Sequence, residues 1–263
     1  AYLARVKHIW HQRSGWSLPQ WFALPVCVTS HVVTISHWCR RNLPLTLRKR
    51  AEIVWNPVEV KYPPDKRAAQ EDIRRELSLS AACLIVAFVA NFSDRKRPET
   101  FVKIAKELRS KGDTDFRFLM FGEAREPQAT AVRRAAVHAG IEDVLYIMGA
   151  KFPIYSWLAG CDILVAPAVR EAFGRSLVEA MLCRVPVVAA DHGGHREIIR
   201  HGDSGYLVNH DEAQAFADRV NMLLDNADLR DQIIQCGQTE ARDRFSTSIH
   251  VMKMCEIYSS ILR

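Results

Sequence analysis

The sequence predicts an α/β protein whose parallel β-sheet is covered by helices on both faces, preceded by the end of a second domain. From residue 80 onward, uninterrupted apolar runs of strand length alternate with segments that have apolar residues at helical spacing. Single helices between buried apolar strands are typical of a parallel, doubly wound sheet. The first 57 residues hold short strand-like runs that are too few to close a core of their own.

The elements of the complete domain follow in order. Strands are expected at residues 83–90, 116–122, 144–149, 162–167, 186–190 and 205–208. Helices are expected between them at 101–110, 128–139, 154–159, 174–183 and 197–200, and after them at 211–225, 228–242 and 247–262. The apolar runs have the length of buried strands, about 4–8 residues.

The beginning of the chain predicts the tail of another α/β unit. Strands are expected at 5–11, 31–36 and 51–55, with a helical turn or two at 37–43. Residues 56–66 contain three prolines and are the best candidate for a linker. We therefore divide the chain into residues 1–57, 58–245 and 246–263.

Composition excludes several classes of protein. Of the 263 residues 48 % are hydrophobic and 25 % charged, as in globular proteins rather than disordered ones. The longest apolar run, 81–90, is about half of the ~20 residues that a membrane-spanning helix needs. No secretory signal pattern is found, and the seven cysteines are scattered without a CxxC pair. We expect a reducing cytoplasm and neither disulfides nor a zinc site.

The positive charge is concentrated in one segment. Residues 1–57 carry eight lysines and arginines against one acidic residue, a net charge of +7, whereas the rest of the chain carries −1. This segment is either a solvated or interdomain face, or a surface attracted to anionic membrane lipid or to an anionic acceptor. Nucleic-acid binding is not expected, because the excess does not extend over the domain.

The most informative loop follows the run at 162–167. Gly174 stands where a helix begins, so the N–H groups of residues 174–177 are expected to be free to bind an anion. Glu179 lies about 7 Å further along the helix axis, where it could accept hydrogen bonds from a ribose if a diphosphate occupied the helix start. Glu171 precedes the helix and would face the group beyond the phosphates. Alternatively, both glutamates favour the helix dipole and nothing more.

Further motifs surround this loop. EAFGRSLVEAMLCRVPVVA (171–189) resembles the E-x7-E motif of retaining glycosyltransferases with the GT-B fold, and most closely that of family 4. Residues 162–167, 193–208 and 89–108 are similar to neighbouring motifs of that family, so the resemblance covers about residues 30–263 in order. It implies that residues 58–245 bind a nucleotide-sugar donor, that 1–57 end the acceptor-side domain, and that 246–263 cross back to that domain.

The resemblance also implies roles for individual residues. A basic pair that neutralises the donor diphosphate corresponds to Asn91 and Lys96, and because Asn91 replaces the usual arginine, either Arg95 or Arg97 could supply the missing charge. Ala172 replaces the usual glycine, so the identity of the sugar is not carried over. Backbone amides that would contact sugar and phosphate belong to Phe173, Gly174, Arg175, Ser176 and Leu177.

A histidine of the acceptor-side domain is expected beside the donor sugar. His11 matches this family position better than His8, and the two would point to opposite faces of a strand. The resemblance thus assigns Glu171, Lys96 and His11 to the reaction, and Glu171 and His11 would position the sugar.

The expected activity is transfer of a sugar from a nucleoside diphosphate to a hydroxyl with retention of configuration, without a cofactor or metal ion. The acceptor would be a glycan or a lipid-linked molecule in the synthesis of surface polysaccharide or glycolipid, and the location cytoplasmic, with membrane contact through residues 1–57 left open. This 263-residue chain alone is expected to bind nucleotide but not to transfer sugar. The alternatives are a non-catalytic subunit that binds nucleotide sugar, and another GT-B enzyme such as a nucleotide-sugar epimerase or a phosphorylase.

Overall fold

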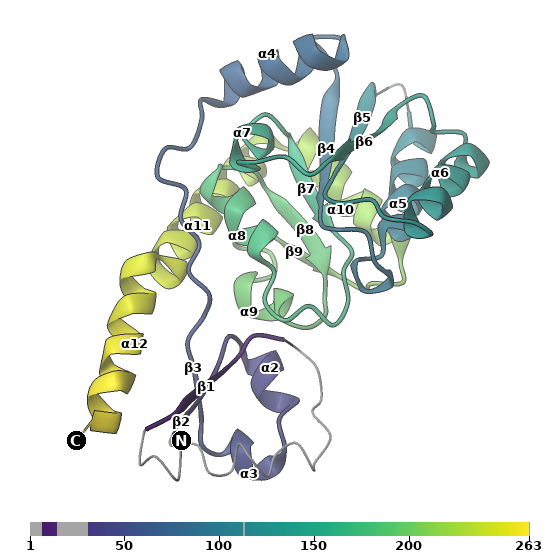
Figure 1. Ribbon diagram of the computed structural model, residues 1–263. Coiled ribbons are helices and arrows are strands. Elements are labelled where there is room, and N and C mark those ends of the chain that lie inside the picture. The colour runs from purple at the N-terminus through teal and green to yellow at the C-terminus, as the bar shows by residue number, and fades with distance from the viewer. Residues whose placement is uncertain (1–6, 15–30, 113, 263) are drawn as a thin grey trace.

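The computed structural model describes residues 7–14, 31–112 and 114–262 and has a larger and a smaller lobe (Figure 1). The larger lobe is built on a six-stranded parallel sheet with the strand order β6-β5-β4-β7-β8-β9. Its strands are β4 (Leu84–Val89), β5 (Phe116–Phe121), β6 (Leu145–Gly149), β7 (Ile163–Ala166), β8 (Val187–Ala190) and β9 (Tyr206–Val208). From β4 the chain adds β5 and β6 toward one edge of the sheet, and from β7 it adds β8 and β9 toward the other edge. The strand order therefore reverses between the neighbouring strands β4 and β7.

Helices cover both faces of this sheet, as the sequence predicts. One face packs against α4 (Lys66–Leu77), α7 (Tyr155–Leu158), α8 (Arg175–Leu182) and α11 (Ala227–Phe245). The other face packs against α5 (Pro98–Ser110), α6 (Gln128–Ala139) and α10 (Ala213–Asp225). The short helix α9 (His195–Ile198) lies at the end of the sheet nearest the smaller lobe (Figure 1).

The expected strands and helices of this lobe are found to within a few residues, but helix α4 was not expected from the sequence. It buries Ala69 and Ile73, while most of its other side chains face solvent. Its start is fixed by Asp65, whose carboxylate accepts a hydrogen bond from the backbone N–H of Ala68 at 2.9 Å. Because only these two side chains are buried, the sequence of α4 shows few apolar residues at helical spacing, and the helix is hard to predict from it.

The smaller lobe contains a three-stranded parallel sheet formed by β1 (Ile9–Gln12), β2 (His31–Thr34) and β3 (Ala51–Ile53). The helices α2 (His37–Arg41) and α3 (Leu45–Arg48) cover one face, where Leu43 and Leu47 pack on Val32. The last helix, α12 (Thr247–Leu262), supplies Ile257 and Ile261 to the other face. The chain's C-terminal end therefore packs on its N-terminal sheet.

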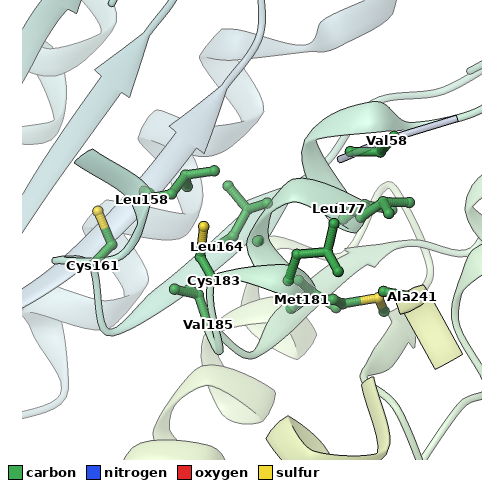
Figure 2. Close-up of a cluster of buried hydrophobic side chains, with 14 of the residues drawn as sticks. Val58, Leu158, Cys161, Leu164, Leu177, Met181, Cys183, Val185 and Ala241 are labelled. Atoms are coloured by element: carbon green, nitrogen blue, oxygen red, sulfur yellow. The ribbon is translucent and has the colours of Figure 1, made fainter. Parts of the chain in front are cut away.

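The two lobes are joined by the segment between β3 and α4 and by the passage from α11 into α12 (Figure 1). These two connecting segments contact each other: the backbone N–H of Val58 donates a hydrogen bond to the carbonyl of Phe245 at 2.9 Å. Val58 also enters the core that contains Leu177 and Met181 of α8 and Ala241 of α11 (Figure 2). The connection between the lobes is thus packed into the larger core.

Two further findings concern membrane passage and thiols. Over the described ranges, no helix combines the length and the apolar character required to cross a membrane. The six cysteines of the described residues are free thiols, and Cys27 lies outside the described residues.

Candidate active site

A cavity of about 590 Å³ opens beside the carboxyl ends of β4 and β7, the two neighbouring strands between which the strand order reverses. Ligands of doubly wound sheets bind at this position, because the loops on either side separate there. Both lobes contribute to its wall. The lining residues are Arg13, Ser14, Ile35, Asn56, Val89, Asn91, Ser93, Arg95, Lys96, Glu171, Ala172, Phe173, Gly174, Arg175, Ser176 and Glu179.

A short ion pair lies in this cavity. Lys96 is the last residue of the 3-10 helix η2 (Asp94–Lys96) that follows β4, and its Nζ donates to Oε2 of Glu171 at 2.6 Å. Nη1 of Arg95 lies 4.0 Å from the same oxygen. Burial alone would raise the pKa of Glu171, but the charge and hydrogen bond of Lys96, with help from Arg95, lower that pKa below its usual value. Glu171 is therefore an ionised carboxylate beside two cations.

Helix α8 begins at the cavity wall. Gly174 precedes its first residue with a φ of +110°, and a Cβ atom there would meet the His195 ring at 3.0 Å. The side chain of His195 is buried, and burial lowers its pKa to about 4, so the ring is neutral. Its Nδ1 donates to the carbonyl of Ala190 at 3.1 Å. A neutral, fixed ring thus supports the start of α8.

The free amides at this helix start differ from the expected set. The N–H of Leu177 donates to the carbonyl of Gly174 at 3.0 Å, and the Leu177 side chain is fully buried in the core. In this structure the Leu177 amide is therefore used within the first turn of α8, and its expected contact with a phosphate stays a prediction. Phe173, Gly174, Arg175 and Ser176 remain at the cavity wall.

Glu179 lies one turn into α8 and also lines the cavity. Burial raises the pKa of its carboxyl, and Nη2 of Arg175, 3.6 Å from Oε1, offsets only part of that rise. The two glutamates of the motif therefore have opposite environments, since Glu171 is paired with lysine and Glu179 is mainly desolvated. The structure brings both to the same cavity.

The two candidate arginines, Arg95 and Arg97, lie in different places. Asn91 lines the cavity, but its Oδ1 accepts a hydrogen bond from the N–H of Glu123 at 2.9 Å, so it organises the loop. Arg95 lines the cavity as well. Arg97 does not, because its guanidinium donates to the carbonyl of His210 and to Asp211, both at 2.8 Å. Of the two arginines, Arg95 is therefore the one at the cavity beside Lys96, and Arg97 is bound outside it.

His11 also lies outside the cavity wall. Its ring stacks against His250 of α12 at a centroid distance of 6.5 Å, and its buried Nε2 has no hydrogen-bond partner within the described ranges. Burial, followed by the nearby Arg13 and His250, lowers the pKa of His11. The face of β1 that carries His11 is covered by α12, and the residues after β1 that line the cavity are Arg13 and Ser14.

Sequence reasoning missed the cavity residues of the smaller lobe. Arg13, Ile35 and Asn56 follow the ends of β1, β2 and β3, and Nη2 of Arg13 donates to Oδ1 of Asn56 at 2.9 Å. The carboxyl ends of parallel strands meet at one edge of a sheet, so the residues after each expected strand were the available signal. In the described ranges, the acidic, cysteine and histidine side chains form no group of three or more that could hold a metal ion.

Two parallel α/β lobes that face each other across such a cavity define the GT-B class of fold. The family model "Glycosyl transferases group 1" matches residues 69–240, and the chain belongs to this family.

Several relatives resemble this chain. N-acetyl-alpha-D-glucosaminyl L-malate synthase of Bacillus anthracis is 27 % identical over 195 residues, which are 73 % of this chain and 49 % of that protein. D-inositol 3-phosphate glycosyltransferase of Corynebacterium efficiens is 29 % identical over 203 residues, 75 % of this chain and 48 % of that protein. The chain therefore spans about half the length of these relatives.

Solved structures share the fold. Alr3699/HepE of Anabaena, crystallised with UDP and glucose, superposes with a TM-score of 0.85 at 22 % identity, covering 98 % of this chain and 73 % of that one. TarM of S. aureus, in complex with fondaparinux, alpha-GlcNAc-glycerol and UDP, gives a TM-score of 0.75 at 18 % identity and covers 91 % of this chain and 46 % of that one.

Proposed function

We propose that this chain is the donor-binding part of a retaining glycosyltransferase of family 4, which transfers a sugar from a nucleoside diphosphate to a hydroxyl group. In this proposal residues 58–245 bind the donor, residues 1–57 end the acceptor-side domain, and residues 246–263 join the two. The observation that carries it is the Lys96–Glu171 ion pair at 2.6 Å, which shares one cavity with the first turn of α8.

The cavity contains a different group for each part of a nucleotide sugar: diphosphate, ribose and sugar. Arg95, Lys96 and the amides at the start of α8 present positive charge and N–H groups to a diphosphate. Glu179, which lines the same cavity, would accept hydrogen bonds from the ribose. Glu171 is ionised and would accept hydrogen bonds from sugar hydroxyls, which fixes the position of the anomeric carbon.

The cations also suit the chemistry of the step. The bond between the anomeric carbon and the diphosphate oxygen breaks through a transition state with oxocarbenium character, while the acceptor oxygen approaches from the same face. Its proton passes to the departing phosphate. Lys96 and Arg95 stabilise the negative charge that grows on that phosphate, so no metal ion is assigned to the site. Arg13 and Ser14 replace His11 as the wall of the smaller lobe beside the sugar.

The comparisons support a uridine nucleotide as the first donor to test. HepE, which shares the fold, was crystallised with UDP-glucose and with UDP. We assign the acceptor to the glycan or lipid-linked class. The enzyme would act in the cytoplasm, where the free thiols stay reduced.

The helices α2 and α3 support contact with an anionic membrane surface. Arg40, Arg41, Arg48 and Lys49 gather around one hollow together with His37. Each basic side chain near an anionic surface contributes about 1 kcal/mol of attraction. In this proposal the smaller lobe is held at the inner face of a membrane that carries the acceptor.

Calorimetric titration of the chain with UDP, UDP-glucose, GDP and ADP tests donor binding. We expect UDP to bind, and Lys96→Met to weaken that binding, while exposed Lys103 on α5 provides the matched control Lys103→Met. The chain by itself is expected to show no transfer, because an acceptor must be held against the anomeric carbon. If the folded chain binds none of these nucleotides, the donor site is wrongly assigned.

One observation favours a second function, a subunit that binds nucleotide sugar without catalysis. Asn91 replaces a cation, and its side-chain oxygen is engaged by Glu123. Turnover of UDP-glucose by a protein that carries both complete domains separates the two: a catalytic protein releases UDP, and a binding subunit does not.

A further inference from the structure

Residues 192–197 of the larger lobe comprise the loop after β8 and the first three residues of α9. This segment touches the smaller lobe on one side and the loop of Glu171 on the other. In Figure 1 helix α9 lies beside α2, and the loop that precedes α8 runs next to it. None of these six residues lines the cavity. Their contacts nevertheless connect the two walls of the cavity.

Toward the smaller lobe, the contact is made by Glu197. Its Oε2 accepts a hydrogen bond from the N–H of His37 at 2.7 Å, and its Oε1 accepts one from the N–H of Trp38 at 2.8 Å. The indole Nε1 of Trp55 donates to Oε2 at 3.3 Å. The Glu197 carbonyl in turn accepts a hydrogen bond from Arg244 of α11 at 2.5 Å. One carboxylate thus collects three donors from the opposite lobe.

Toward the donor loop, the same segment holds the backbone on both sides of Glu171. Nδ1 of His192 accepts a hydrogen bond from the N–H of Arg170 at 2.9 Å, and the N–H of Gly194 donates to the Glu171 carbonyl at 2.8 Å. Arg170 has a left-handed φ of +51°, a backbone angle that residues other than glycine rarely adopt. The ring of Trp38 packs edge-on against His192 at 5.0 Å. Contacts to both lobes therefore meet within six residues.

Close packing makes this connection stiff. A Cβ atom on Gly193 would lie 2.6 Å from the Glu171 carbonyl oxygen, and one on Gly194 would lie 2.7 Å from Cα of Phe173. Backbone is in direct contact with backbone at both places, so a shift of the segment must shift the donor loop.

We propose that Glu197 is a positioning residue, which fixes segment 192–197 against the smaller lobe and thereby holds Glu171 in place for the donor sugar. This inference rests on the proposed function only for its consequence in sugar transfer. The mechanical link between the lobes and the donor loop stands on the contacts alone.

Amide hydrogen exchange measured on the whole chain tests the link. In Glu197→Ala the amides of His37 and Trp38 lose their acceptor, and we expect them to exchange about ten-fold faster or more. The decisive reporters are the amide N–H groups of Arg170 and Gly194, which bind His192 and Glu171 and not the Glu197 carboxylate, and they should also exchange several-fold faster. Amides of α6 report global stability and should not change.

Two variants sharpen the test. Glu197→Gln keeps one oxygen acceptor without the charge, so it should restore protection at only one of His37 and Trp38 and give intermediate protection at Arg170 and Gly194. It carries the test if the alanine variant does not fold. Asp191→Asn removes a neighbouring carboxylate that pairs with Arg196 within the same lobe. It should leave the exchange of the four amides unchanged.

The outcomes separate this inference from the proposed function. Faster exchange at His37 and Trp38 with unchanged exchange at Arg170 and Gly194 would overturn the link, as would equal acceleration in α6. UDP affinity is measured in parallel: if the wild-type chain does not bind UDP, the donor assignment fails while the exchange data still decide the link. If UDP binds, Glu197→Ala should weaken UDP-glucose binding by several-fold more than UDP binding, because Glu171 contacts the sugar and not the nucleotide, whereas Asp191→Asn should change neither affinity.

Discussion

Replacement of Lys96 by methionine should uncover the cost of burying Glu171. The side chains of Lys96 and Glu171 are 21 % and 11 % exposed, so their ion pair at 2.6 Å is largely shielded from water. Removing one partner of a buried pair leaves an uncompensated charge, which costs about 3–5 kcal/mol when burial is complete. Because Arg95 remains 4.0 Å away and the cavity is open, we expect a loss of about 1.5–3 kcal/mol at neutral pH.

The pH dependence of this loss gives a second signature. In the wild type the pKa of Glu171 is lowered, so the pair stabilises the fold above the ordinary carboxyl pKa and the contribution disappears as the pH falls through the lowered value. In Lys96→Met the uncompensated burial raises that pKa. The variant then gains stability as the pH falls through the raised pKa, so its deficit against the wild type narrows as the pH falls from neutral toward the ordinary carboxyl pKa.

Urea unfolding at several pH values measures both effects. The matched control is Arg97→Met, since Arg97 is 23 % exposed, much like Lys96, but its acidic partner Asp211 is 67 % exposed and lies outside the cavity. The carboxylate left behind stays hydrated, so this change should cost much less. Equal losses in the two variants, or a deficit of Lys96→Met that does not change with pH, would show that the ion pair does not hold Glu171 ionised.

Three further predictions follow from the same geometry. Glu179→Ala should weaken UDP binding by roughly 10- to 150-fold in calorimetry, because an acceptor for ribose hydroxyls is lost; unchanged affinity would remove Glu179 from the site. Gly194→Ala places a Cβ atom 2.7 Å from Phe173 and should cost about 1–3 kcal/mol, seen as a lower unfolding midpoint and weaker UDP binding; a wild-type midpoint would refute the packing argument. Joint replacement of Arg40 and Arg41 by glutamine should reduce co-sedimentation with anionic vesicles and leave UDP affinity unchanged, whereas equal sedimentation would exclude this face as a membrane contact.

The sequence by itself determined the order of the elements and the position of the donor loop. Buried strands such as 83–90 need continuous apolar side chains, and this local requirement is written directly in the residues. The same holds for the E-x7-E spacing, because one turn of helix carries Glu179 from the start of α8 along the cavity wall. Helix α4 escaped prediction because it buries little apolar surface.

Only the tertiary structure decided which side chains reach the cavity. Arg95 and Arg97 are two residues apart, yet one faces Glu171 and the other is held by Asp211, more than a hundred residues away in sequence. His11 faces α12 because that helix, from the far end of the chain, covers its side of β1. Glu197 likewise finds its partners in the opposite lobe. A side chain's partner depends on which distant element packs against it, and the local pattern of apolar and polar residues does not predict that element.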